Sequence, residues 1–107
     1  MNDLIYKNIY EYDSKLKDFE ISYSNRPLPL EDLIISYKGR NKMAKDEAIK
    51  ELTSEVLINL LLLKEKSIEY IKFVVVRKDN ISRLFFFSED YSEIYFDFTF
   101  PKNDIFG

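Results

Sequence analysis

Residues 84–100 read LFFFSEDYSEIYFDFTF, and this stretch decides the fold. It consists of an apolar, aromatic run, a short acidic interruption at Glu89 and Asp90, and a second run in which apolar and polar side chains alternate. Alternation with a period of two is typical of a β-strand, and a short polar break between two such runs is typical of a turn. The stretch therefore predicts two neighbouring strands, 81–88 and 91–100.

A third strand is predicted directly upstream, because the apolar period becomes two from Tyr70 onward. This strand covers 70–77, and the turn residues 78–80 join it to the next strand. Connections this short cannot cross over a sheet. The three strands are therefore expected to form an antiparallel meander.

The alternation also divides the side chains between the two faces of this sheet. Leu84 and Phe86 are expected to lie on the core face, so Phe85 and Phe87 point to the other side. Either the N-terminal segment covers these two rings as a third layer, or another molecule does. In the last strand the expected core-facing set is Ile94, Phe96, Phe98 and Phe100, and the expected solvated set is Glu93, Tyr95, Asp97 and Thr99.

Upstream of the sheet, the segment 44–66 lacks Gly and Pro and predicts one long central helix. Apolar residues cover so much of its C-terminal half that little polar surface remains. A helix that is apolar nearly all round is buried nearly all round. We therefore expect this helix to pack between the sheet and the earlier helices.

Two shorter elements precede the long helix. Pro29 suits the first turn of a helix and Gly39 suits its end, so the sequence predicts a helix over 29–38. Nearer the N-terminus, the apolar spacing predicts a helix over 3–17, followed by a short strand over 19–23. The competing interpretation of this N-terminal segment is a β-hairpin, which the alternation of its tyrosines also permits.

Together these elements predict an α+β protein, with N-terminal helices packed on a C-terminal three-stranded antiparallel meander sheet. The chain has 107 residues, and this length suits a single domain that spans 1–107. Nine Phe and eight Tyr supply much of the expected core.

The composition restricts the chemistry that the protein can perform. The chain contains no His, no Cys and only two Gly. These absences exclude Ser-His and thiolate mechanisms, most zinc sites and the glycine-rich loops that bind nucleotides. We expect no enzyme activity, no metal and no cofactor. The lack of Cys, of a signal-peptide pattern and of a long apolar run predicts a cytoplasmic protein that does not use a membrane.

The charged residues argue against three further functions. The net charge is −3 and the isoelectric point is about 5.0, so the sequence predicts no direct nucleic-acid partner. The basic run from Lys38 to Lys45 precedes acidic residues and is interpreted as a solvated loop. Glu93 and Asp97 lie about 13 Å apart along a strand, which is too far for the usual catalytic carboxylate pair. The stretch SEDYSE lacks the spacing and the glycine of a calcium loop.

By elimination, the sequence predicts a non-enzymatic protein-binding domain. Bacterial immunity proteins, which inhibit a cognate toxin by occluding its active site, have this general character. The expected partner is a protein, namely a basic toxin such as a nuclease, because an acidic and aromatic surface attracts a basic cleft. The alternatives are a homodimeric structural or adaptor protein that pairs through its sheet, and a phage-encoded inhibitor of a host defence enzyme. The predicted partner-binding residues are Glu89, Asp90, Glu93, Tyr95 and Asp97, with Phe85 and Phe87 as anchors.

Overall fold

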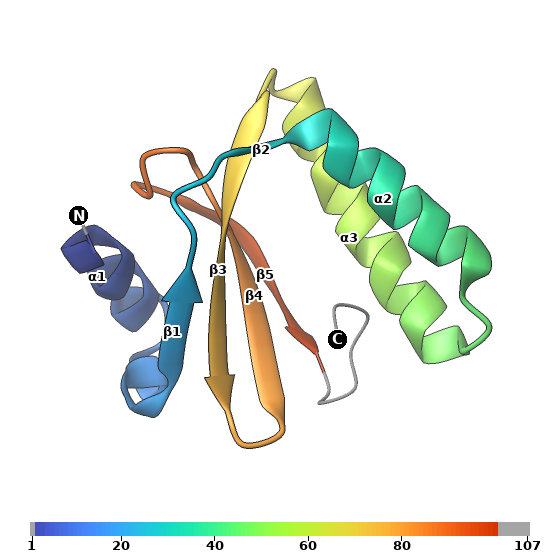
Figure 1. The fold of residues 1–107 in the computed structure, drawn as a ribbon. Coiled ribbons are helices and arrows are strands. Elements are labelled where there is room, and N and C mark those ends of the chain that lie inside the picture. Colours follow the sequence, from blue (N-terminus) through green and yellow to red (C-terminus); the bar gives the residue numbers. More distant parts are fainter. Residues whose placement is uncertain (1, 101–107) are drawn as a thin grey trace. The chain divides into compact units, whose positions relative to one another are not determined.

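The computed structural model describes residues 2–100 and shows an α+β protein, which confirms the predicted class. The antiparallel sheet has five strands, because two short N-terminal strands join the three of the predicted meander. Figure 1 labels these elements in chain order. The helical elements are α1 (Asn2–Tyr12), the 3₁₀ helix η1 (Ser14–Asp18), α2 (Leu30–Met43) and α3 (Glu47–Glu65). The strands are β1 (Glu20–Tyr23), β2 (Leu28–Pro29), β3 (Tyr70–Lys78), β4 (Ile81–Phe87) and β5 (Ile94–Phe100).

The described chain divides into two compact units. The first unit comprises residues 2–27 and 72–100, and therefore contains α1, η1, β1, β4, β5 and most of β3. The second unit comprises residues 28–71 and contains β2, α2, α3 and the first residues of β3. The expectation of a single domain stays a prediction, as does the expected contact between the long helix and the sheet.

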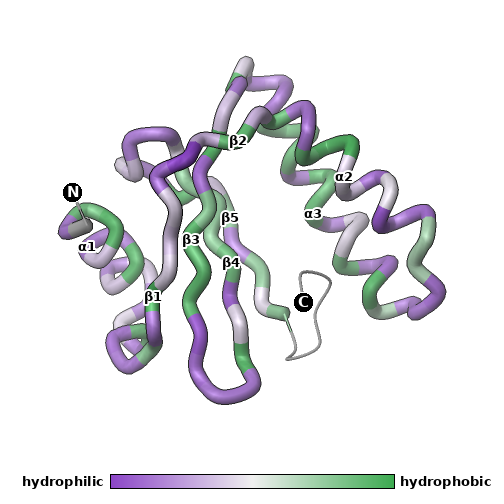
Figure 2. Tube along the Cα trace, viewed as in Figure 1, coloured by the Kyte–Doolittle hydropathy of each residue, from purple (hydrophilic) through white to green (hydrophobic). Residues whose placement is uncertain are grey.

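The sheet of the first unit has the strand order β1-β3-β4-β5, with every neighbouring pair antiparallel. The predicted meander of β3, β4 and β5 is confirmed. The N-terminal strand β1 is added at the β3 edge, where Glu20 pairs with Arg77 and Tyr23 with Val74. In the second unit, the two residues of β2 pair with the start of β3. Figure 2 shows hydrophobic stretches along β3 and β4, as buried strands require.

The N-terminal segment is helical, so the helix interpretation is confirmed over the hairpin, although the helix is interrupted. α1 ends at Tyr12 because Asp13 has an extended backbone, with φ −154° and ψ 105°. The Asp13 side chain accepts a hydrogen bond from the backbone N–H of Lys15 at 3.0 Å and so caps η1. This change of direction still leaves Ile9 and Leu16 buried.

The N-terminal segment covers the face of the sheet that carries Phe85 and Phe87. Both rings have no exposed surface, and they pack in one cluster with residues of α1 and η1. Figure 1 shows α1 beside this end of the sheet. The N-terminal segment therefore supplies the third layer that the sequence left open, and the role of these two rings as anchors for a partner stays a prediction. The cluster consists of Ile5, Ile9, Leu16, Val74, Val76, Phe85, Phe87 and Tyr91.

The alternation in β5 is broken by a bulge. Phe86 pairs with Phe96, but Phe87 pairs with Ile94, so the register shifts between Phe86 and Phe87. The extra residue, Tyr95, moves Ile94 to the side of Phe87, where it packs against the N-terminal cluster. The expectation that Ile94 shares a face with Phe96 was wrong, because the sequence alone does not show a bulge. The strand also begins at Ile94 rather than at residue 91.

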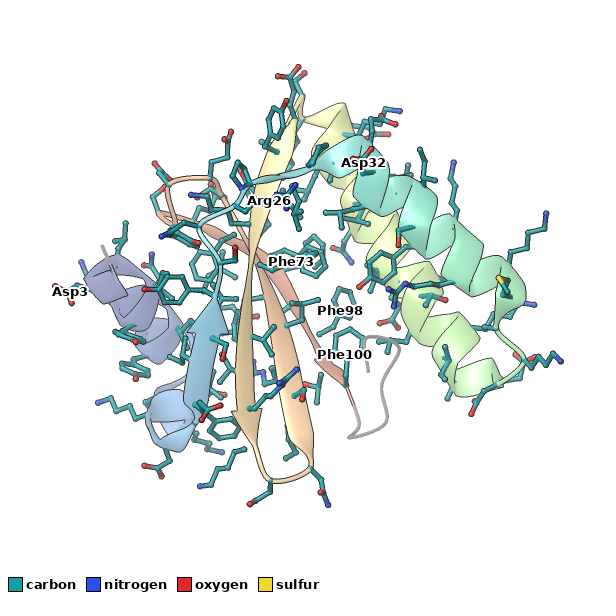
Figure 3. All side chains as sticks on the ribbon, in the orientation of Figure 1. Asp3, Arg26, Asp32, Phe73, Phe98 and Phe100 are labelled. Carbon is teal, nitrogen blue, oxygen red and sulfur yellow. The ribbon has the colours of Figure 1, made fainter. Side chains whose placement is uncertain are left out.

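The other face of the sheet carries a group of stacked phenylalanines. The rings of Phe86 and Phe96 are stacked with centroids 4.2 Å apart, and Phe73 meets Phe86 edge to face at 4.8 Å. Phe98 packs against both Phe86 and Phe96. Figure 3 labels Phe73, Phe98 and Phe100, which project from the sheet on the side away from α1. These contacts agree with the predicted core face of the last two strands.

The second unit is built on an antiparallel hairpin of α2 and α3. α2 runs to Met43, past the predicted end at residue 38, so Gly39 lies inside the helix rather than at its end. Beyond it, the Asn41 side chain donates hydrogen bonds to the backbone carbonyl of Lys50 at 2.8 Å and to the hydroxyl of Thr53 at 2.7 Å. These contacts with α3 hold the last turn of α2 in helical form. The helix continues because they offset the intrinsic cost of Gly39.

α3 begins at Glu47 because Asp46 caps it, accepting a hydrogen bond from the Ala48 N–H at 2.8 Å. Its buried stripe includes Val56 and Leu60, whereas Ile58 is 59% exposed. The expectation that its C-terminal half is buried nearly all round was therefore wrong. Among the described residues, none of the helices combines the length and the apolar character needed to cross a bilayer.

Candidate functional site: the acidic turn

The candidate site is the connection between β4 and β5, residues 88–93, which we call the acidic turn. Its ends are joined because the Ser88 N–H donates to the Glu93 carbonyl at 2.9 Å. The Tyr91 N–H donates to the Ser88 carbonyl at 3.0 Å, and the Ser88 hydroxyl accepts from the Glu93 N–H at 3.0 Å. The turn is thus closed by its own backbone and by one serine.

Asp90 organises the centre of the acidic turn. One of its carboxylate oxygens accepts hydrogen bonds from the Ser92 hydroxyl at 2.6 Å, the Ser88 hydroxyl at 2.9 Å and the Ser92 N–H at 3.0 Å. The side-chain and backbone hydrogen bonds from Ser92, followed by the bond from Ser88, lower the pKa of Asp90 to about 2. The carboxylate is therefore ionised at every physiological pH and held in one orientation.

Tyr91 anchors the turn to the body of the first unit. Its backbone is left-handed, with φ 63°, a conformation that a non-glycine residue adopts only when its surroundings impose it. The buried ring meets Phe87 and Tyr23 edge to face, and its hydroxyl donates to the Ser24 carbonyl at 2.9 Å. The Asn8 side chain of α1 donates to the Tyr91 carbonyl at 2.7 Å.

Around this anchor the acidic side chains face solvent. Glu89, Asp90 and Glu93 are exposed, and Figure 2 shows a largely hydrophilic loop at this place. Tyr95 at the bulge is half-buried. Burial raises the pKa of Tyr95, and the charges of Glu93, Asp90 and Glu89 raise it further, in that order. The three carboxylates therefore lie near enough to the Tyr95 phenol to raise its pKa. Four of the predicted site residues thus form one group: Glu89, Asp90, Glu93 and Tyr95.

Asp97, the fifth predicted polar residue, is engaged elsewhere in the first unit. One of its oxygens accepts hydrogen bonds from Arg83 Nη2 at 2.8 Å and Nε at 3.2 Å, and the other accepts from the Tyr12 hydroxyl. Arg83 Nη1 also donates to Asp13 at 2.9 Å. Asp97 thus ties β4 and β5 to the end of α1. Both of its carboxylate oxygens have internal partners, and its assignment as a partner-binding residue stays a prediction.

This second cluster joins Tyr12, Asp13, Arg83 and Asp97, and its pKa shifts follow from its contacts. The hydrogen bond to Asp97, together with burial, raises the pKa of Tyr12 to about 12. The pKa of Asp13 is lowered, first by the Lys15 N–H and then by Arg83. The guanidinium of Arg83 also lies over the Phe85 ring, 5.2 Å from its centroid. The cluster is structural and joins segments far apart in the sequence.

Sequence reasoning missed Tyr91 and the cluster around Arg83. Tyr91 carried one signal, an aromatic residue inside an acidic turn, which is costly unless the ring is buried. Arg83 carried a second, a charge within the apolar strand β4. Neither signal shows which residues of the chain Tyr91 and Arg83 contact. In the part of the chain that the structure describes, no group of three acidic side chains is arranged to hold a metal ion.

Comparison of the chain with models of protein families, with curated proteins and with solved structures found no match.

Proposed function

We propose that the protein is a non-enzymatic inhibitor that binds a basic protein partner through the acidic turn. The observation that carries the proposal is the presentation of Glu89, Asp90 and Glu93 on a turn that internal hydrogen bonds hold in place. Their turn is closed by internal hydrogen bonds and anchored by the buried Tyr91. A surface that is already ordered loses little conformational entropy when it binds.

The chemistry of the turn indicates the kind of partner. Three exposed carboxylates beside the half-buried Tyr95 complement a basic cleft with an apolar wall. Enzymes that cleave nucleic acid have such clefts, because their substrate is a polyanion. In this proposal the protein is a cytoplasmic immunity protein whose turn occludes the active site of a nuclease toxin. An inhibitor carried by a phage against a host defence enzyme would use the same contacts.

The test is affinity capture from host lysate with the tagged protein and two charge-reversed variants. Glu89→Lys with Glu93→Lys reverses the acidic turn and leaves Asp90 and Tyr91 in place. Glu11→Lys with Glu20→Lys makes the same change in net charge at exposed positions outside the turn. We expect the parent and the control to retain a basic protein in stoichiometric amount, and the turn variant to lose it.

The captured protein is then purified, and its nuclease activity is measured with increasing amounts of the parent. Stoichiometric inhibition supports an immunity function. Equal capture by all three forms would place the contact outside the acidic turn and contradict the proposal. A homodimeric structural or adaptor protein remains the second candidate, and exposed apolar residues of the α2–α3 hairpin favour it.

A further inference from the structure

The α2–α3 hairpin exposes several large apolar side chains to solvent. Ile35 on α2 is 65% exposed, and Ile58 and Leu62 on α3 are 59% and 49% exposed. Single exposed apolar residues are ordinary, but a group on two adjacent helices is typical of an interaction surface. All of these residues belong to the second unit, so the inference is independent of the acidic turn.

The exposed apolar residues share a face with charged residues of opposite sign on the two helices. On α2, Ile35, Lys38 and Lys42 are spaced by three and four residues, so they lie on one side of the helix. On α3, Glu51, Glu55 and Ile58 follow the same spacing. All six are exposed. We call them the hairpin face.

The hairpin face lies on one side of the helix pair. On α3, its residues lie roughly opposite the buried stripe, which includes Val56. On α2, they lie beside the buried stripe, which includes Ile34, and are displaced from its middle by about 100° around the helix. The contacts of Asn41 with Thr53 and Ser54, and of Glu31 with Lys64, mark the side on which each helix faces the other. On both helices the exposed set is displaced from this side in the direction away from the buried stripe, so we place the two sets on the same outer side of the hairpin. Figure 1 shows α2 and α3 as neighbouring helices along their length.

Two contacts set the register of the hairpin. Near one end, Lys64 Nζ lies 2.6 Å from a carboxylate oxygen of Glu31, and near the other, Asn41 bonds to the Lys50 carbonyl and to the Ser54 hydroxyl. Between these fixed points, equal rise along both helices sets three levels. Ile35 is level with Ile58, Lys38 with Glu55, and Lys42 with Glu51.

A second copy of the chain can be related to the first by a two-fold axis that runs parallel to the helices. Such an axis places α2 of one copy against α3 of the other, antiparallel and at the same level. Ile35 then meets Ile58 of the second copy, while Lys38 and Lys42 meet its Glu55 and Glu51. The same contacts occur a second time, with the copies exchanged. The hairpin face of one copy therefore matches the hairpin face of the second copy, both in its apolar residues and in its charges.

We propose that the protein forms a symmetric homodimer in which two α2–α3 hairpins pack through their hairpin faces as an antiparallel four-helix arrangement. The apolar residues supply the buried area, and the four Lys–Glu pairs select the orientation. A two-fold axis perpendicular to the helices would instead bring α2 against α2 and oppose lysine to lysine. The charges thus disfavour the competing arrangement.

The test is sedimentation equilibrium of the full chain from low-micromolar to near-millimolar concentration. The parent is expected to dimerise. Lys38→Glu with Lys42→Glu, and separately Glu51→Lys with Glu55→Lys, put like charges across every pair. Each variant is expected to raise the dimer dissociation constant by about tenfold or more, because four attractive pairs become repulsive. Lys7→Glu with Lys17→Glu, at exposed positions in the first unit, is the matched control and should leave the constant unchanged.

The decisive step is to mix the two variants. In the mixed dimer every reversed lysine position faces a reversed glutamate position, so attraction returns at all four pairs. A heterodimer is expected at concentrations at which each variant alone is mainly monomeric. Failure of the mixture to dimerise would show that the substitutions acted within each hairpin, and would overturn the proposal. A parent that stays monomeric at every concentration, or variants that dimerise like the parent, would overturn it as well. Lysine and glutamate reversal at these positions leaves the acidic turn intact, so partner capture is scored separately.

Discussion

Arg83 on β4 and Asp97 on β5 form an ion pair that is largely withdrawn from solvent. Arg83 Nη2 lies 2.8 Å from a carboxylate oxygen of Asp97, and the two side chains are 17% and 14% exposed. The pair is diagonal in the sheet, because Arg83 pairs with Thr99 and Asp97 with Phe85. Tyr12 and Asp13 extend it to the N-terminal segment. It therefore links the sheet to the layer that covers Phe85.

Replacing Asp97 with Ala is expected to lower the free energy of unfolding by about 1.5 to 3 kcal/mol, the usual worth of hydrogen bonds to a charged group. The loss arises because Arg83 keeps only Asp13 as an acidic partner in a half-buried place. Chemical denaturation measures the difference. Glu93→Ala on the exposed turn is the control and should change stability by less than about 0.5 kcal/mol. Equal midpoints for parent and Asp97→Ala would contradict the structural role of the pair.

The Tyr12 phenol is expected to titrate with a pKa of about 12, above its ordinary value of 10.0, mainly because it donates a hydrogen bond to Asp97. Since the folded pKa lies above the unfolded one, the stabilising contribution is complete below pH 10 and is lost as the pH rises through 12. The difference in tyrosinate absorbance between the parent and Tyr12→Phe isolates this group. A difference titration centred near pH 10 would show that the hydrogen bond does not form.

Asp90 is expected to stabilise the acidic turn in a pH-dependent way. Its folded pKa of about 2 lies below the ordinary value of 3.8, so its contribution is present above about pH 4 and is lost as the pH falls through 2. Asp90→Asn should therefore be less stable than the parent at neutral pH, and the gap should close in acid. Glu89→Gln removes a neighbouring charge outside these hydrogen bonds and is the control for the change in net charge. Unfolding curves recorded across this pH range test both statements.

Leu60 and Leu61 are adjacent on α3 but differ in environment, since Leu60 is fully buried and Leu61 is 41% exposed. Leu60→Ala is expected to cost about 2 to 5 kcal/mol, because it removes buried methyl groups and leaves a cavity. Leu61→Ala removes the same atoms and should cost far less. Thermal or chemical unfolding compares the two. Similar losses would contradict the described orientation of α3.

Gly39 offers a test of the extended α2. A Cβ atom built on it meets nothing within 4 Å, and the residue lies inside the helix. Gly39→Ala is therefore expected to raise the free energy of unfolding by about 1 kcal/mol, the difference in helix propensity between the two residues. The measurement is best made at low concentration, where self-association contributes least. A loss of stability would instead support the sequence-based interpretation of Gly39 as a helix end.

The groups that touch the acidic turn were only partly visible in the sequence. Glu89, Asp90, Glu93 and Tyr95 lie close together along the chain, so a tight turn between two strands was enough to group them. The role of Tyr91 was not visible, because its anchoring depends on Ser24 and Asn8, which are distant in sequence. The same holds for Asp97, because its partners Arg83 and Tyr12 lie on other elements of the fold.

The sequence by itself determined the α+β class, the order of the main helices and the meander of β3, β4 and β5, because helix and strand periods are local properties of the side-chain pattern. Tertiary structure alone decided which face Ile94 presents at the start of β5, where α2 ends, and what covers Phe85 and Phe87. Each of these depends on contacts between segments far apart in the chain. Such contacts depend on the free energy of the whole fold, and a short stretch of sequence does not contain the residues at both ends of the contact.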